Sequence, residues 1–413
     1  MKSGVCLSLS SLVDAGSALI YMFIQHVLIF LFKWPPPPGP EYPKSPKGRI
    51  AIIGAGVTGI SSAAHAIAHG FDVVIYEQSD TVGGVWTRVN ETSGLQINSL
   101  LYRFHPAVLW SSSFPSRDEV VHQVRKIWEE YHLEPRTRFN TPVKSVRRVK
   151  GTGLPPHGDP SSPRSRWIIN DGEDGIFDAV VATWIIPRNV VVGALIAGQP
   201  AGREWPIWLT WQKVITWWNY RDVPELVPAR IGLFETTPIV NDEFAKVVKS
   251  GKCRYVRGDI VRFTNGGVRV KVRRRQEKPG EGKAEREYAG DLVVLATGFK
   301  RPPFDFFQDE LFPKGYDGPN LYLQGFSTED WSVLTTNATF QHGMGSVGHV
   351  HIGIYMRILF TFLMDTKTRP TRQEMKLWVD IVRFIKRDAP GGAFSFFTYT
   401  ELSASLVVHF GFL

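Results

Sequence analysis

The chain has 413 residues, 43% of them hydrophobic and 21% charged, and a formal net charge of +9 at pH 7. This composition excludes a disordered chain and gives room for two or three folded domains. No DNA- or RNA-recognition motif accompanies the positive charge, and the two cysteines, Cys6 and Cys253, are too few for a disulfide framework or a zinc site. We therefore expect no nucleic-acid partner and no metal.

The first element in chain order is an apolar helix. Residues Ala15–Phe32 carry no full charge, and at about 1.5 Å per residue a helix of this length nearly matches a hydrocarbon core of about 30 Å. Lys33 and Trp34 are typical of a membrane interface, and Pro35–Pro38 ends any helix. We expect a single-pass membrane anchor, and the basic residues that follow it predict a catalytic body on the cytosolic side. A cleaved signal peptide and a buried core helix are the alternatives.

A strand–helix–strand pattern follows the proline-rich linker. Arg49–Ile53 is a nearly continuous apolar run, as in a parallel strand buried on both faces. The sequence Gly-Ala-Gly-Val-Thr-Gly comes next, and Ile60–His69 is a helix of small residues that Gly70 closes. Asp72–Tyr76 is the second strand. Together these elements predict a dinucleotide-binding βαβ unit.

The glycines and the acidic residue of this unit each have a physical role. Gly54 permits the tight turn, Gly56 lets the backbone approach a pyrophosphate, and Gly59 lets helix and strand pack closely. Glu77, about twenty residues further on, can accept hydrogen bonds from a ribose hydroxyl. A carboxylate there repels a 2′-phosphate, so the site favours FAD or NAD over NADP.

The next motifs distinguish these two cofactors. Val82-Gly83-Gly84-Val85-Trp86, after the acidic residue, resembles the flavin-containing and Baeyer–Villiger monooxygenase superfamily, whose members use FAD and NADPH. The resemblance implies that Gly84 and Trp86 contact FAD. It continues at Gly94–Ser99, where Asn98 is similar to the family asparagine that faces the flavin and stabilises its oxygenated form. Asparagine is also common in turns, and that reading of Asn98 stays open.

Two later segments extend the resemblance. Asn140–Val143 is similar to the family strand whose backbone meets the adenine, which implies a cofactor contact at Val143. Gly290–Phe299 resembles a returning strand with the Ala-Thr-Gly-Phe motif, which implies contacts at Thr297 and Gly298.

The expected NADPH-binding unit is missing from the sequence. Phe177–Thr183 resembles the strand that leads to the first Ala-Thr-Gly motif, but Trp184 replaces the glycine. No second strand–helix unit with a Gly-x-Gly-x-x-Gly or Gly-x-Gly-x-x-Ala turn occurs in the middle of the chain, so NADPH is expected as the reductant without an identifiable site. A lost exon, a natural short form and a non-catalytic relic are the three explanations. Arg203–Tyr220 holds five tryptophans, which fit either an aromatic-substrate cleft, a membrane interface or a core helix.

Taken together, the sequence predicts a doubly wound α/β FAD domain of Rossmann type that contains a reduced second domain and follows an amino-terminal transmembrane helix. The expected parts are a membrane anchor (1–33), a linker (34–48), the first part of the FAD domain (49–183), a reduced NADPH or substrate domain (184–289) and the return to the FAD domain with the carboxyl-terminal segment (290–413). The expected activity is insertion of one atom of O₂ into a hydrophobic small molecule, in secondary-metabolite or pigment biosynthesis and near other biosynthetic enzymes. An H₂O₂-forming oxidase and a relic that scaffolds a membrane-bound assembly are the alternatives.

Overall fold

The computed structural model describes residues 9–95, 99–100, 102–153, 164–183, 220–221, 223–227, 242–294, 304–335, 352–385 and 387. Its central sheet has five parallel strands in the order β11–β7–β1–β2–β3. The strands are β1 (Arg49–Ile53), β2 (Asp72–Tyr76), β3 (Thr137–Arg138), β7 (Ala179–Ala182) and β11 (Val333–Leu334). If the five strands of this sheet are numbered along the chain, their spatial order is 3-2-1-4-5, which is the Rossmann arrangement. The predicted α/β fold is confirmed.

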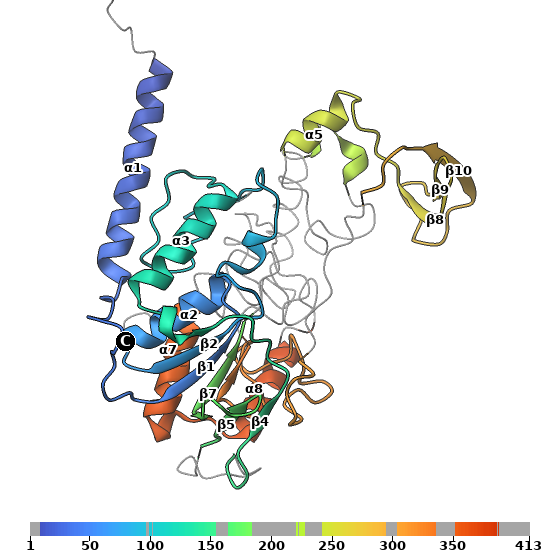
Figure 1. Cartoon of the computed structure of the whole chain (residues 1–413). Helices are drawn as coiled ribbons and strands as arrows, with labels where there is room; N and C mark the ends of the chain where they lie inside the picture. Colours follow the sequence, from blue (N-terminus) through green and yellow to red (C-terminus); the bar gives the residue numbers. More distant parts are fainter. Residues whose placement is uncertain are drawn as a thin grey trace, which may run out of the picture.

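Side chains of the strands alternate between two buried layers. In β1, Ile50 and Ile52 face one core cluster and Ala51 faces the other, and all three are fully buried. This explains why the strand is apolar at every position. The first cluster lies under three helices, shown behind and beside the sheet in Figure 1. They are α2 (Val57–Ala68), α3 (Arg117–Glu130) and α7 (Ile352–Met364).

The second face of the sheet differs from the expectation of a doubly wound fold. A three-stranded antiparallel sheet covers it, formed by β4 (Val146–Arg148), β5 (Trp167–Ile169) and β6 (Ile176–Phe177). Trp167 and Phe177 are fully buried between the two sheets. Strands of two or three residues carry too little alternation to be recognised in a sequence.

The described chain begins with the helix α1 (Leu9–Phe32), which runs along the side of the domain and rises past α3 (Figure 1). Polar side chains attach its second half. Gln25 is fully buried, where it donates to the carbonyl of Trp110 at 2.9 Å and accepts from the Trp110 N–H at 2.8 Å and from Arg103 at 3.0 Å. Tyr21 donates to the carbonyl of Ser112 at 2.7 Å, and Lys33 pairs with Glu130.

The predicted membrane-spanning anchor is not supported. No helix in the described ranges is both long and apolar enough to cross a membrane. The second half of α1 is bonded to the folded domain through Tyr21 and Gln25.

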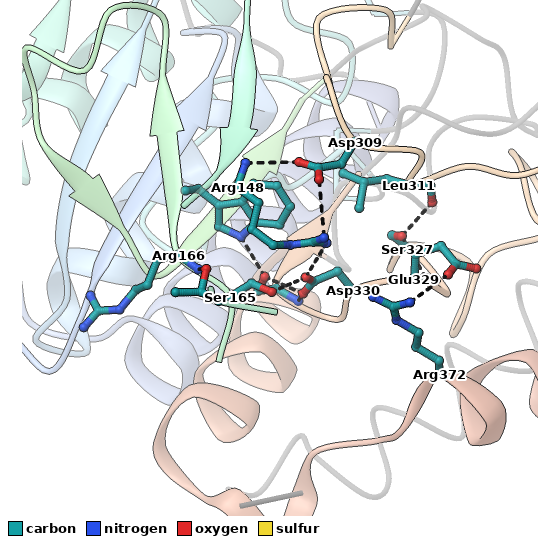
Figure 2. Close-up of polar contacts among 12 residues, drawn as sticks. Arg148, Ser165, Arg166, Asp309, Leu311, Ser327, Glu329, Asp330 and Arg372 are labelled. Atoms are coloured by element: carbon teal, nitrogen blue, oxygen red, sulfur yellow. Dashed lines mark hydrogen bonds and ion pairs between the residues drawn. The ribbon is translucent and has the colours of Figure 1, made fainter. Parts of the chain in front are cut away.

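A buried polar network fixes the segment that returns to the domain (Figure 2). Arg148 of β4 pairs with Asp330 at 3.0 Å and with Asp309 at 3.4 Å. Asp330 is fully buried and also accepts from Ser165 and Ser332. Because the network joins residues more than 160 positions apart, it holds β11 in place beside β7.

The remaining described elements include a second antiparallel sheet, which Figure 1 shows beyond α5. This sheet consists of β8 (Gly258–Thr264), β9 (Gly267–Val272) and β10 (Ala284–Ala289). The other helices are α5 (Asp242–Lys249) and α8 (Arg372–Ile385). The short 3-10 helices are η1 (Gly84–Thr87), η2 (Glu134–Arg136), η4 (Pro224–Leu226) and η6 (Thr366–Thr368). Strands β8, β9 and β10 pair with their chain neighbours as an antiparallel meander. The returning strand predicted at Gly290–Phe299 is wrong in its described part, residues 290–294, which form no strand and leave Leu292 83% exposed. The strand that completes the parallel sheet is β11.

Candidate dinucleotide-binding site

The loop after β1 is a glycine turn at the point where the order of the sheet reverses. Gly54 has a φ of +102°, in the left-handed region that favours glycine, and its N–H donates to the carbonyl of Tyr76 at 2.8 Å. A β-carbon at Gly54 would lie 2.9 Å from Oγ1 of Thr183, at the end of the neighbouring β7. Ligands of open α/β sheets bind beyond the carboxyl ends of the strands at this reversal point.

The other two glycines of the motif have different steric environments. A β-carbon at Gly59 would lie 1.8 Å from the carbonyl oxygen of Gly54, so no side chain fits there. Gly56 precedes α2 with a φ of −75°, and a β-carbon there would meet only the Cα of Gly84 at 3.6 Å, an ordinary contact. Gly59 is therefore needed for packing, whereas protein atoms leave room at Gly56.

A second pair of glycines packs on this turn. Gly83 and Gly84 have φ values of +123° and +59°, and the Gly83 N–H donates to the carbonyl of Ala55 at 2.9 Å. A β-carbon at Gly84 would lie 2.9 Å from the Cα of Gly56. The glycine turn at residues 54–59 and the glycine pair at residues 83–84 therefore contact each other through their backbones.

Glu77 lies against the turn with its carboxylate almost fully buried. One carboxylate oxygen accepts from the Ala55 N–H at 2.7 Å and the other from the Ser79 N–H at 2.8 Å. Each oxygen keeps acceptor capacity for a further hydrogen bond. The carboxylate is held at the side of the turn, where a ribose joined to a pyrophosphate would lie.

The amino end of α2 opens at the same place. No side chain caps the helix, and the positive end of its dipole meets the glycine turn. Backbone N–H groups in this setting are an anion site, and the absence of β-carbons lets a phosphate come close to them. The residues present therefore fit the pyrophosphate of a dinucleotide, with Glu77 as a sugar ligand.

Two predicted contact residues lie next to this turn. Trp86 is buried and its indole N–H donates to the hydroxyl of Tyr102 at 2.9 Å. Burial raises the pKa of Tyr102 above its ordinary value, which keeps this hydroxyl protonated. Val143 is half-buried against the core on the β4–β6 side, shortly after Thr141, whose N–H donates to the carbonyl of Glu77 at 2.8 Å. A direct cofactor contact of Trp86 and Val143 stays a prediction.

The structure thus brings together Gly54, Gly56, Gly59, Gly84 and Glu77. Asn98, Thr297 and Gly298 lie outside the described residues. The sequence interpretation missed Thr183, whose hydroxyl donates to the carbonyl of Ile53 at 2.7 Å beneath the glycine turn. The available signal was the position of Thr183 directly after the apolar run Ala179–Ala182, because neighbouring parallel strands end at the same edge of a sheet.

The site defines a dinucleotide-binding α/β domain, and the comparisons agree. The family model described as an NAD(P)-binding Rossmann-like domain matches residues 52–123. A flavin-containing monooxygenase of Arabidopsis thaliana, FMO GS-OX-like 5, is 26% identical over 243 residues, which cover 48% of this chain and 49% of that protein. A Baeyer–Villiger monooxygenase of Pseudomonas aeruginosa is 32% identical over 100 residues, which cover 23% of this chain and 19% of that protein.

Solved structures with a likeness to the chain include OTEMO in complex with FAD and NADP. It is 24% identical, with 39% of this chain and 29% of that chain covered and a TM-score of 0.28. The sequence matches show that the chain is similar to flavin-containing and Baeyer–Villiger monooxygenases, in agreement with the resemblance of its motifs. The chain spans between about a fifth and about a half of the length of the curated relatives it matches.

Proposed function

We propose that the chain binds FAD and acts as an FAD-dependent monooxygenase. The observation that carries the proposal is the contact of two glycine-rich segments at the amino end of α2, with Glu77 bonded to the same turn. This arrangement fits a pyrophosphate and a ribose hydroxyl. The acidic residue and the Gly-Gly-x-Trp element favour FAD among the dinucleotides, and the related proteins are flavin monooxygenases by name.

The chain's own residues would bind and orient the cofactor. The backbone at Gly54–Gly56 would hold the pyrophosphate, Glu77 would accept from the ribose, and Val143 would meet the adenine with its backbone. Bound flavin supplies the activation of O₂ once a nicotinamide coenzyme has reduced it. By resemblance Asn98 faces the flavin, and the next residue, Ser99, is fixed by a 2.9 Å bond from its N–H to the carbonyl of Ser113.

The substrate class is proposed on chemical grounds. The five tryptophans between Arg203 and Tyr220 lie outside the described residues, and their large aromatic side chains are chemically suited to a hydrophobic small molecule. We propose a substrate from secondary-metabolite or pigment biosynthesis, oxygenated near other enzymes of the same route. Product analysis after incubation with ¹⁸O₂ tests oxygen insertion, whereas release of all reduced oxygen as H₂O₂ would identify an oxidase.

The second candidate function is a flavin-holding or empty relic in a membrane-bound assembly. One specific observation favours it: no second strand–helix unit with a Gly-x-Gly-x-x-Gly turn occurs in the middle of the sequence, so NADPH, the proposed reductant, has no identified site. Stopped-flow mixing of the FAD-loaded protein with NADPH separates the two functions. Rapid loss of flavin absorbance supports the monooxygenase, and an unchanged spectrum at saturating NADPH supports the relic.

FAD binding is tested first. Purified protein should be yellow, with one FAD per chain released on denaturation, and the apoprotein should take up added FAD. A well-folded protein that is colourless and does not bind FAD in a calorimetric titration would exclude both the cofactor and the monooxygenase activity.

A further inference from the structure

The two faces of α1 have opposite character. One face is bonded to the domain through Tyr21, Gln25 and Lys33. The other face, here called the apolar stripe, consists of large hydrophobic side chains that the described part of the chain leaves exposed. They are Leu19, Ile20, Phe23, Ile24, Val27, Phe30 and Leu31. Phe23 is 69% exposed and Phe30 is 86% exposed, so the stripe is not the margin of a core contact.

The width of the apolar stripe indicates what covers it. At about 100° per residue, its seven members span an arc of about 140° around the helix axis. A two-helix coiled-coil seam is narrower, since it uses only two positions in seven. No charged residue occurs between Ala15 and Phe32. A broad, uncharged and partly aromatic surface fits the acyl boundary of a bilayer better than a second helix.

Aromatic and basic groups gather at the carboxyl end of the stripe. Trp34 is 43% exposed and its ring lies 4.5 Å from that of His69. Lys47 is exposed and its side chain approaches Gly70, the next residue after His69. Lys44, also exposed, precedes it in the same linker. Tryptophan and lysine are the residues that lie at the headgroup level of membranes, and lysines favour anionic lipids.

The geometry points to α1 as an in-plane anchor on an anionic lipid surface. The apolar stripe enters the boundary between headgroups and acyl chains, while the opposite face holds the dinucleotide-binding domain against the membrane through Tyr21 and Gln25. Anionic lipids are concentrated in the cytoplasmic leaflet, which places the domain in the cytosol. The helix lies on the bilayer and does not cross it. This inference is independent of the proposed activity.

Vesicle flotation of the full chain tests the inference. The wild-type protein should float with vesicles of phosphatidylcholine and phosphatidylglycerol, bind less to phosphatidylcholine alone, and be released by an alkaline carbonate wash. The double variant Phe23→Asp/Phe30→Asp should reduce the floated fraction at least about tenfold, because two large apolar groups leave the bilayer. Phe263→Asp on β8, a residue 52% exposed, is the matched control and should float like the wild type.

Thermal unfolding of each variant distinguishes lost binding from lost folding, since all substituted side chains are exposed. The inference is overturned if the wild type stays in solution with both kinds of vesicle, or if the double variant floats equally well. It is also overturned if the wild type is a dimer that the double variant dissociates without any flotation. Resistance to the carbonate wash would contradict an in-plane helix and indicate a spanning one.

Discussion

Gly56 and Gly59, at the start of α2, should respond differently to the same added methyl group. At Gly59 the new β-carbon would lie 1.8 Å from a buried backbone oxygen, so the turn or the helix must move. Overpacking of this kind costs about 3 kcal/mol, which corresponds to a fall in Tm of about 6–12 °C for a domain of this size. At Gly56 the new β-carbon makes only a 3.6 Å contact at a φ of −75°. Gly56→Ala should therefore change stability by less than about 1 kcal/mol.

Gly56→Ala, the variant with the smaller loss of stability, should nevertheless lose FAD affinity. The β-carbon of Gly56→Ala occupies the space through which the pyrophosphate approaches the helix, so FAD affinity should fall by about 1–3 kcal/mol, or about 5- to 150-fold in Kd. Calorimetric unfolding of the apoproteins and FAD titration of the folded ones measure the two quantities. Wild-type FAD affinity in Gly56→Ala would refute the placement of the phosphate, and wild-type stability in Gly59→Ala would refute the packing of the turn.

Three further predictions concern buried polar groups. Glu77→Gln should weaken FAD binding and lower the free energy of unfolding by about 1–3 kcal/mol, because the new amide NH₂ would face a backbone N–H that donates to the carboxylate in the wild type. Chemical denaturation measures this loss, and an unchanged stability would contradict the described bonds. Asp330→Ala should lower the free energy of unfolding by about 3–5 kcal/mol, because it leaves Arg148 without its buried partner. Asp309→Ala, which removes the more exposed carboxylate, should lower it by at most about 1 kcal/mol. Equal losses would show that the network of Figure 2 is not buried as described. Burial, together with the charges of Lys33 and Arg103, lowers the pKa of His105 to about 3. The unfolded state, with a pKa of about 6.5, then binds the proton first, so stability should fall as the pH drops below about 6.5, by about 2–3 kcal/mol at pH 4.5 from this group. His105→Asn keeps an acceptor for the Ala107 N–H and should flatten that slope in urea denaturation; a slope as steep as that of the wild type would exclude His105 as its source.

The part of the fold that the sequence predicts well is the local βαβ unit. Arg49–Ile53 and Asp72–Tyr76 are strands with the predicted bounds, and Gly70 has the left-handed φ of +84° expected of a helix end. The apolar runs, the glycine spacing and the helix all lie within about thirty residues, so one pattern specifies them. Glu77 could be placed for the same reason, because it directly follows Asp72–Tyr76, the strand that pairs with Arg49–Ile53 in a βαβ unit.

The parts that could not be predicted depend on contacts between distant segments. The position of β11 (Val333–Leu334) involves contacts between distant segments, such as the pairing of Asp330 with Arg148, 182 positions away. Its two apolar residues carry no periodicity of their own. Gln25 is a polar residue beside His26 within the predicted membrane span, and in the structure it is one of the groups that attach α1 to the domain. A hydropathy pattern records that a helix is apolar, but it does not record which face has a partner.

The structure of the FAD complex is the most direct measurement of the central claim. We expect the pyrophosphate within hydrogen-bonding distance of backbone N–H groups at the glycine turn and the amino end of α2, with a ribose hydroxyl donating to Glu77. An FAD molecule whose pyrophosphate binds away from the carboxyl ends of β1 and β7, or whose ribose does not reach Glu77, would contradict the account.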